Sequence, residues 1–141
     1  HDIGKAVLDQ YVEAVRPLLY RNVQMPGIDL VRAETGLFGT SHPEVGGRLA
    51  RLWAVPETLA DAIEFHHQPE QATIGSELTH LIYLADLITS RFMVGQELEK
   101  LNTEGFASRM RKAGFRSDQL PHLIDNALVE IHNAAWPVAC Q

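Results

Sequence analysis

The chain has a single cysteine, Cys140, among its 141 residues. A disulfide needs two cysteines and a structural thiolate metal site needs several, so neither can form inside this chain. Proteins without disulfides are typical of reducing compartments. We therefore expect a cytoplasmic protein.

Long apolar runs, basic runs and a signal-peptide pattern are missing as well. A membrane-spanning helix needs about 18 or more consecutive apolar residues, and a secreted precursor opens with a charged and then apolar leader. Nucleic-acid-binding proteins usually carry a basic stripe, whereas this chain has 12 Lys and Arg against 18 Asp and Glu. We expect neither a membrane nor a nucleic acid as a partner.

Sustained alternation of apolar and polar residues, the pattern of half-buried strands, is also missing. The apolar fraction of 45% and the charged fraction of 21% are those of a globular protein, and the length suits one domain. Apolar residues recur at steps of three and four almost throughout. The sequence therefore predicts an all-α fold, a helical bundle of about six or seven helices in a single domain over residues 1–141.

The helices are expected in seven stretches, which are residues 9–22, 27–36, 41–55, 56–67, 76–92, 103–115 and a C-terminal stretch that begins near 117. Pro17 would bend the first helix, Gly36 would end the second, and Pro56 suits the first turn of the fourth. Ser41 and Glu44 have capping-box spacing, and Ser117 is the expected N-cap of the last helix.

Apolar stripes on three of these helices predict the core. In the helix at 41–55 the buried face is expected to consist of Val45, Leu49 and Leu52 with Trp53. Core residues expected on later helices are Leu78, Leu81, Ile82, Ala85, Leu120, Leu123, Ile124, Ala127, Leu128 and Ile131. Trp53 and Trp136 are interpreted as core anchors rather than as ligand platforms.

The first five residues, HDIGK, carry a candidate metal-binding motif. Adjacent His and Asp side chains can both bind one hard or borderline metal ion. Lys5 follows Asp2 by three positions and could offer its ammonium group to a phosphate. The chain begins at this motif with His rather than Met, which we interpret as the start of a fragment of a longer signalling protein. A remnant of a purification tag is the alternative for His1.

Polar residues interrupt the apolar faces in three further places. His66 and His67 follow Ile63 by three and four positions. Asp86 follows Ile82 by four, which puts a carboxylate on an otherwise apolar face, and a buried charge needs a partner. His42 lies in the first turn of its helix, four residues before Gly46, and a glycine there permits close approach of another backbone.

Each of these residues has an ordinary structural explanation when taken alone, such as helix capping or a surface position near a helix end. Together they supply only nitrogen and oxygen ligands, which suit Fe, Mn, Zn or Mg. The candidate metal ligands are His1, Asp2, His42, His66, His67 and Asp86. Glu34 is a further candidate, as a carboxylate that would support His42.

Three stretches resemble the HD superfamily, and most closely its HDOD branch of bacterial signalling domains. They are HDIGK at 1–5, TSHPEVGGRLARLWAVPETLADAIEFHHQPE at 40–70 and YLADLIT at 83–89. The His-x-x-x-Gly, Trp-x-x-Pro and His-His elements occur in order. The resemblance covers about residues 1–93, and the helices from residue 103 onward are compatible with it.

The resemblance implies roles for these residues. In HD proteins a pair like His1 and Asp2 binds metal, a lysine like Lys5 assists with phosphate, and a late aspartate like Asp86 completes the first site. In members with two metal ions, histidines like His42, His66 and His67 bind the second ion. An enzyme of this kind would use Lys5 and Asp2 in catalysis.

Two departures from the family pattern narrow the expected function. The histidine that HD proteins supply from an upstream helix has no counterpart in this chain, so the first metal site would be incomplete. The related HD-GYP phosphodiesterases continue after His-His into a Gly-Tyr-Pro loop, whereas this chain continues Gln68-Pro69-Glu70-Gln71. Hydrolysis of cyclic dinucleotides is therefore not supported.

Two functions remain open. The first is a non-catalytic HDOD-type output module, as in response regulators, that acts through protein contacts and keeps a vestigial metal site. Its partners would be other signalling proteins or an N-terminal receiver or sensor domain, and it could form a homodimer. The alternative is a metal-dependent phosphohydrolase.

Overall fold

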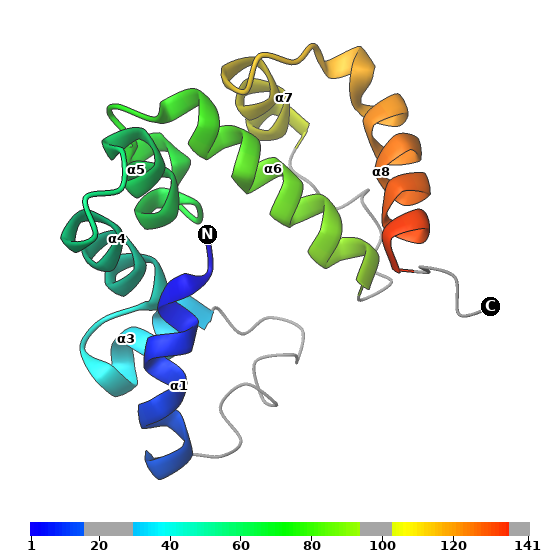
Figure 1. Ribbon diagram of the computed structural model, residues 1–141. Helices are drawn as coiled ribbons and strands as arrows, with labels where there is room; N and C mark the ends of the chain where they lie inside the picture. Colours follow the sequence, from blue (N-terminus) through cyan, green and yellow to red (C-terminus); the bar gives the residue numbers. More distant parts are fainter. Residues whose placement is uncertain (16–29, 94–102, 136–141) are drawn as a thin grey trace. The chain divides into compact units, whose positions relative to one another are not determined.

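The computed structural model describes residues 1–15, 30–93 and 103–135. These ranges contain seven α-helices, two short 3-10 helices and no β-strand, which confirms the all-α prediction. The helices are α1 (Ile3–Val15), α3 (Leu30–Phe38), α4 (His42–Leu52), α5 (Glu57–Phe65), η1 (Pro69–Gln71), α6 (Ser76–Met93), α7 (Thr103–Lys112), η3 (Ser117–Gln119) and α8 (Leu120–Ala135) (Figure 1). None of the helices in these ranges is both long and apolar enough to cross a bilayer.

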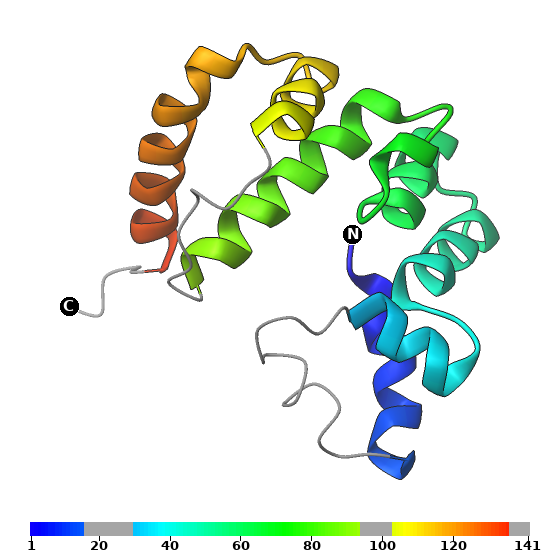
Figure 2. The same ribbon diagram turned by 180° about the vertical axis from the view of Figure 1, so that it is seen from behind.

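The chain divides into two compact units, His1–Tyr83 and Leu84–Gln141, and α6 runs from the first into the second. A single domain over residues 1–141 stays a prediction, and each unit is described by itself. In the first unit α4 packs against both α1 and α5. Figures 1 and 2 show α4 and α5 side by side from opposite directions.

Glycines allow the helices of the first unit to approach closely. A Cβ atom on Gly4 of α1 would lie 2.0 Å from the carbonyl oxygen of His42. On Gly46 of α4 it would lie 2.8 Å from Cγ2 of Ile63 and 3.4 Å from the backbone nitrogen of Gly4. The contacts at 2.0 and 2.8 Å leave no room for a side chain unless a neighbour moves. The predicted close approach at Gly46 is confirmed, and it brings the starts of α1 and α4 together.

The predicted core face of α4 is wrong. Leu52 is 80% exposed and Trp53 is 59% exposed, while Val45 and Leu49 are half-buried. The buried residues of this helix are His42, Pro43, Gly46, Gly47 and Ala50. Small residues line the packed face because α1 and α5 approach it too closely for large side chains, so the large apolar residues lie elsewhere. Trp136 lies outside the described residues.

Several predicted helix ends also differ from the structure. Ser41 is the N-cap of α4, but its side chain makes no capping hydrogen bond. The carboxylate of Glu44 accepts a hydrogen bond from the hydroxyl of Thr40 at 2.8 Å. The first helix already starts at Ile3, and Pro17 lies beyond the described part. Helix α3 passes Gly36 and ends at Phe38.

The junction of α5 and α6 is built around a buried carboxylate that the sequence did not single out. One Asp61 oxygen accepts hydrogen bonds from the backbone nitrogens of Thr73, Ile74 and Gly75 at 2.9, 2.8 and 3.2 Å. The other oxygen lies 3.7 Å from Arg51. We call this arrangement the Asp61 junction, and it fixes the loop that leads into α6.

The apolar stripe predicted on α6 is wrong. Leu81 and Ala85 are exposed, and the buried residues of this helix in the described part include Thr79, His80, Leu84 and Ile88. Apolar residues occur on several sides of α6, so their spacing alone did not select one face.

In the second unit η3 connects α7 to α8 and packs against both. The buried side chains between Gly105 and Phe115 are Phe106, Met110 and Ala113. The predicted N-cap at Ser117 is wrong, because Ser117 is the first residue of η3. The N-cap of this short helix is Arg116, whose backbone N–H donates to the Gln119 side chain at 2.8 Å. Of the stripe predicted on α8, Leu120, Leu123, Ile124 and Ala127 are half-buried.

Candidate metal site

Three helices of the first unit bring predicted ligands to one place. His1 and Asp2 precede α1, His42 opens α4, and His66 and His67 directly follow α5. The glycine contact between Gly4 and the His42 carbonyl sets the distance between the first two elements. In Figure 1 the N-terminus lies beside the end of α5. We call His1, Asp2, His42, His66 and His67 the histidine cluster.

The distances within the histidine cluster are short. Oδ1 of Asp2 lies 3.4 Å from Nε2 of His42 and 3.6 Å from Nε2 of His66. Nε2 of His42 lies 3.1 Å from Nε2 of His67. His1 approaches the other Asp2 oxygen at 3.5 Å, and its ring meets that of His66 edge-on, with centroids 4.7 Å apart. Ring nitrogens and a carboxylate therefore converge on a common space.

Two sets of three residues have the spacing of metal ligands. In the set His42, His66 and His67, and again in the set His1, Asp2 and His66, one ligand atom from each residue lies within 4.8 Å of the others. His66 belongs to both sets, so the cluster could hold one ion or two neighbouring ions. The donors are imidazole and carboxylate, which suit Fe, Mn or Zn.

Two buried atoms of the cluster support a bound cation. Oδ1 of Asp2 and Nε2 of His66 are buried and make no hydrogen bond. Nδ1 of His66 lies 2.7 Å from the carbonyl oxygen of Ile63 and must donate a proton to it, because a carbonyl only accepts. In the neutral ring, Nε2 then carries a lone pair. A lone pair and a carboxylate oxygen that face each other without a proton between them fit a metal ion.

The electrostatics keep Asp2 charged. Burial alone would raise the pKa of its carboxyl, but His42, His66 and Lys5 outweigh that effect and hold the pKa well below its usual range. Lys5 donates a hydrogen bond to Oδ2 of Asp2 at 2.7 Å. Burial would lower the pKa of His42, yet the nearby carboxylates of Asp2 and Glu34 raise it. A metal ion at Nε2 of His42 would compete with the proton that these carboxylates favour.

Asp86 lies on α6 in the second unit, where its side chain is half-buried. Its place among the metal ligands stays a prediction. The other five predicted ligands lie in the histidine cluster of the first unit. His66 is fully buried, whereas His67 is exposed, so the two adjacent histidines have different surroundings.

Two further buried residues near these elements, Glu34 and His80, were hard to predict from the sequence. Glu34 is completely buried, and its carboxylate lies 2.7 Å from Nδ1 of His42. Glu34 lies on a short predicted helix, eight residues before His42, and this closeness in sequence was the indication that it could support His42. His80 is also fully buried, with Nδ1 against the carbonyl oxygen of Ser76 at 2.7 Å. No motif in the sequence points to it.

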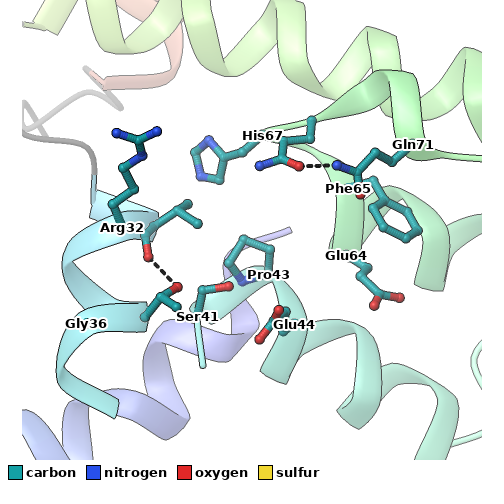
Figure 3. A pocket seen from close by; sticks show the side chains of 12 residues that line it. Arg32, Gly36, Ser41, Pro43, Glu44, Glu64, Phe65, His67 and Gln71 are labelled. Carbon is teal, nitrogen blue, oxygen red and sulfur yellow. Dashed lines mark hydrogen bonds between the residues drawn. The ribbon is translucent and has the colours of Figure 1, made fainter. Parts of the chain in front are cut away.

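A pocket of about 710 Å³ borders the cluster at His67. Its walls come from α3, the start of α4, and the end of α5 with η1. Figure 3 shows Arg32 and His67 toward one end and Glu64 and Phe65 toward the other. Its polar lining includes Arg32, Ser41, Glu44, Glu64, His67 and Gln71. The pocket is large enough for a small organic molecule beside the cluster.

One comparison, with models of protein families, gave a match. Neither the curated proteins nor the solved structures gave a match to the chain. A family model, described as HDOD domain, matches residues 1–69. The match includes all five residues of the histidine cluster as well as Lys5 and Glu34. Residues 1–69 are therefore similar to an HDOD domain.

Proposed function

We propose that this chain is an HDOD-type signalling module that binds a divalent metal ion in its histidine cluster and acts through contacts with other proteins. Those partners would be signalling proteins, a receiver or sensor domain of the same polypeptide, or a second copy of the chain. Metal occupancy would bias the packing of α1, α4 and α5, because each of the three carries cluster residues at one end.

The observation that carries the metal-binding part is the pair of buried atoms without hydrogen bonds, Oδ1 of Asp2 and Nε2 of His66, 3.6 Å apart. Leaving a buried polar atom without a partner costs about 1 to 3 kcal/mol. A metal ion between them would satisfy both. In the neutral ring of His66, hydrogen bonding alone does not, since its one ring proton is donated to Ile63.

Exposed apolar side chains near the turn between α4 and α5 support the protein contacts. Leu52 and Trp53 end α4 with most of their surface exposed, and Leu59 on α5 and Ile74 are also exposed. Ala54 in this turn has a φ of 55°, a conformation that non-glycine residues rarely adopt. Large exposed aromatic and aliphatic side chains are common in protein interfaces.

The test is the metal content of the protein purified without chelator, measured by inductively coupled plasma mass spectrometry. We expect bound Fe, Mn or Zn in the wild-type protein and its loss in Asp2→Ala. Asp9→Ala is the matched control, because Asp9 is an exposed aspartate of α1 outside the cluster. A folded wild-type protein without metal, also after incubation with each ion, would contradict the proposal.

A second candidate function is metal-dependent phosphoester hydrolysis. Its support is the pocket beside His67 together with Lys5, whose ammonium group lies at the edge of the cluster on Asp2. A bound ion would act as a Lewis acid toward a phosphoryl oxygen. In such an enzyme the pocket would hold the organic part of the substrate, and Lys5 and Arg32 would neutralise phosphate charge.

A panel of phosphoesters separates the two functions. Hydrolysis by the metal-loaded protein that is lost in both Asp2→Ala and Lys5→Ala, but kept in Asp9→Ala, would establish the enzyme. No hydrolysis by a protein shown to hold metal would leave the signalling module as the function.

A further inference from the structure

Glu34 on α3 makes two hydrogen bonds to the same residue. One of its oxygens, Oε2, accepts from the backbone nitrogen of His42 at 2.8 Å and lies 2.7 Å from the Nδ1 atom of the His42 ring. Both side chains are completely buried. Glu34 is not among the six residues predicted as metal ligands, and its carboxylate faces the side of the ring away from Asp2 and His67.

The chemistry of this contact decides which nitrogen of His42 carries the proton. An ionised carboxylate can only accept hydrogen bonds, so Nδ1 must be the donor. In the neutral ring the lone pair then resides on Nε2. Nε2 is the atom that lies 3.4 Å from Asp2 and 3.1 Å from His67. Glu34 thus directs the lone pair of His42 into the cluster.

We propose that Glu34 is a positioning residue that fixes the ring orientation and tautomer of His42, so that Nε2 is available as a metal ligand. The inference rests on the proposed metal site and names a residue that controls it from outside the ligand set. A carboxylate behind a ligating imidazole also makes the imidazole a stronger base and a better ligand.

A purely structural role is the competing explanation. Glu34 could simply cap α4, because its bond to the His42 backbone satisfies a free N–H at the start of that helix. A cap needs only the backbone bond, whereas Glu34 also contacts the ring nitrogen of His42. The other Glu34 oxygen, Oε1, is buried without a hydrogen bond. Burying a carboxylate with one unpaired oxygen costs free energy, and a residue that served only as a helix cap would not need to be buried in this way.

The experiment compares Glu34→Ala and Glu34→Gln with the wild-type protein. The glutamine carbonyl can accept the same two hydrogen bonds but carries no charge, so it is the conservative variant. Asp61→Asn is the matched control, since Asp61 is also a buried carboxylate of the first unit that accepts backbone N–H groups. It lowers stability without touching His42.

Two measurements are made on each protein. Long-range ¹H–¹⁵N NMR spectra of the metal-free protein, on the high-pH plateau where the imidazole is neutral, report the tautomer of His42. Isothermal titration with Zn²⁺ alone reports the affinity. We expect the Nδ1–H tautomer in the wild-type protein, the same tautomer in Glu34→Gln, and its loss in Glu34→Ala. The Zn²⁺ affinity should fall roughly 10- to 100-fold in Glu34→Ala, less in Glu34→Gln, and not at all in Asp61→Asn.

The inference is overturned if wild-type His42 carries its proton on Nε2, or if folded Glu34→Ala binds Zn²⁺ as tightly as wild type. An equal loss of affinity in Asp61→Asn would also overturn it, because the effect would then follow stability. If the wild-type protein binds no Zn²⁺, the proposed metal site is wrong, whereas the NMR spectra still decide whether Glu34 orients His42.

Discussion

Asp61 and Asp2 are both aspartates of the first unit, but their oxygens have different surroundings. In the Asp61 junction one oxygen accepts three backbone hydrogen bonds and the other faces Arg51. In the histidine cluster, Oδ1 of Asp2 is buried next to two imidazoles and makes no hydrogen bond. Fully satisfied buried groups are the rule in folded proteins, and an unsatisfied one requires an explanation such as a bound ion.

The comparison predicts that the two sites respond differently to substitution. Changes in the Asp61 junction should lower stability and leave the metal affinity of the folded protein intact. Changes to the ligands of the histidine cluster should weaken metal binding and leave the stability of the metal-free protein nearly unchanged. The glycine contact that supports the cluster should affect both properties.

The largest effect is expected for Gly4→Ala. The new Cβ would lie 2.0 Å from the His42 carbonyl oxygen, a backbone atom that cannot move without displacing α4. We expect a loss of about 3 kcal/mol or more in unfolding free energy and weaker metal binding, measured by urea denaturation and Zn²⁺ titration. Gly36→Ala is the control, because nothing lies within 4 Å of its Cβ. That change should stabilise the helix by about 0.5 to 1 kcal/mol.

Asp61→Ala should come next. It removes the acceptor for three backbone N–H groups at the start of α6, of which the one on Gly75 is buried. We expect a loss of about 2 kcal/mol or more in urea denaturation, with the Zn²⁺ affinity of the folded protein unchanged. A parallel loss of Zn²⁺ affinity would show that the junction is part of the site after all.

Acid should weaken the Asp61 junction in a predictable direction. Burial tends to raise the pKa of Asp61, but its backbone hydrogen bonds and Arg51 lower it below the ordinary value for aspartate. The stabilisation is therefore complete above the unfolded pKa of about 3.9 and is lost as the pH falls through the lower folded pKa. Urea denaturation at a series of acidic pH values should show a shallower decline for Asp61→Asn than for wild type. An equal decline of the unfolding free energy with falling pH in the two proteins would contradict this prediction.

The smallest change in stability is expected for His66→Leu. Leucine is apolar and similar in size to histidine, and it lacks the Nε2 atom, which makes no hydrogen bond in His66. The change also removes the hydrogen bond from Nδ1 to the carbonyl oxygen of Ile63. The unfolding free energy of the metal-free protein should change by no more than about 1 kcal/mol. Zn²⁺ binding should nevertheless be abolished, because His66 belongs to both ligand sets.

His122→Leu is the control for that variant, since His122 is an exposed histidine of α8 in the second unit. It should leave the Zn²⁺ titration unchanged. A large loss of stability in His66→Leu together with intact Zn²⁺ binding would mean that the cluster is structural and that the comparison with Asp61 is mistaken.

Much of the fold could be predicted from residue spacing, and the predictions of buried faces that were wrong have a common cause. The periodicity of the helices that became α4 and α6 located both helices correctly but selected the wrong faces. On α4, small residues are buried and Leu52 and Trp53 are exposed. Periodicity assumes that the largest apolar residues are buried, whereas a close helix crossing buries the smallest ones.

The helical class and the candidate ligand types could be read from the sequence alone, because helix formation depends on local spacing and because side-chain type sets which metals can bind. The HDIGK motif and the His-His pair were visible without coordinates. The burial of His66, the exposure of its neighbour His67 and the contact of Glu34 with the His42 ring could be seen only in the three-dimensional structure. These relations depend on how α1, α3, α4 and α5 pack, and packing joins residues that are distant in the sequence.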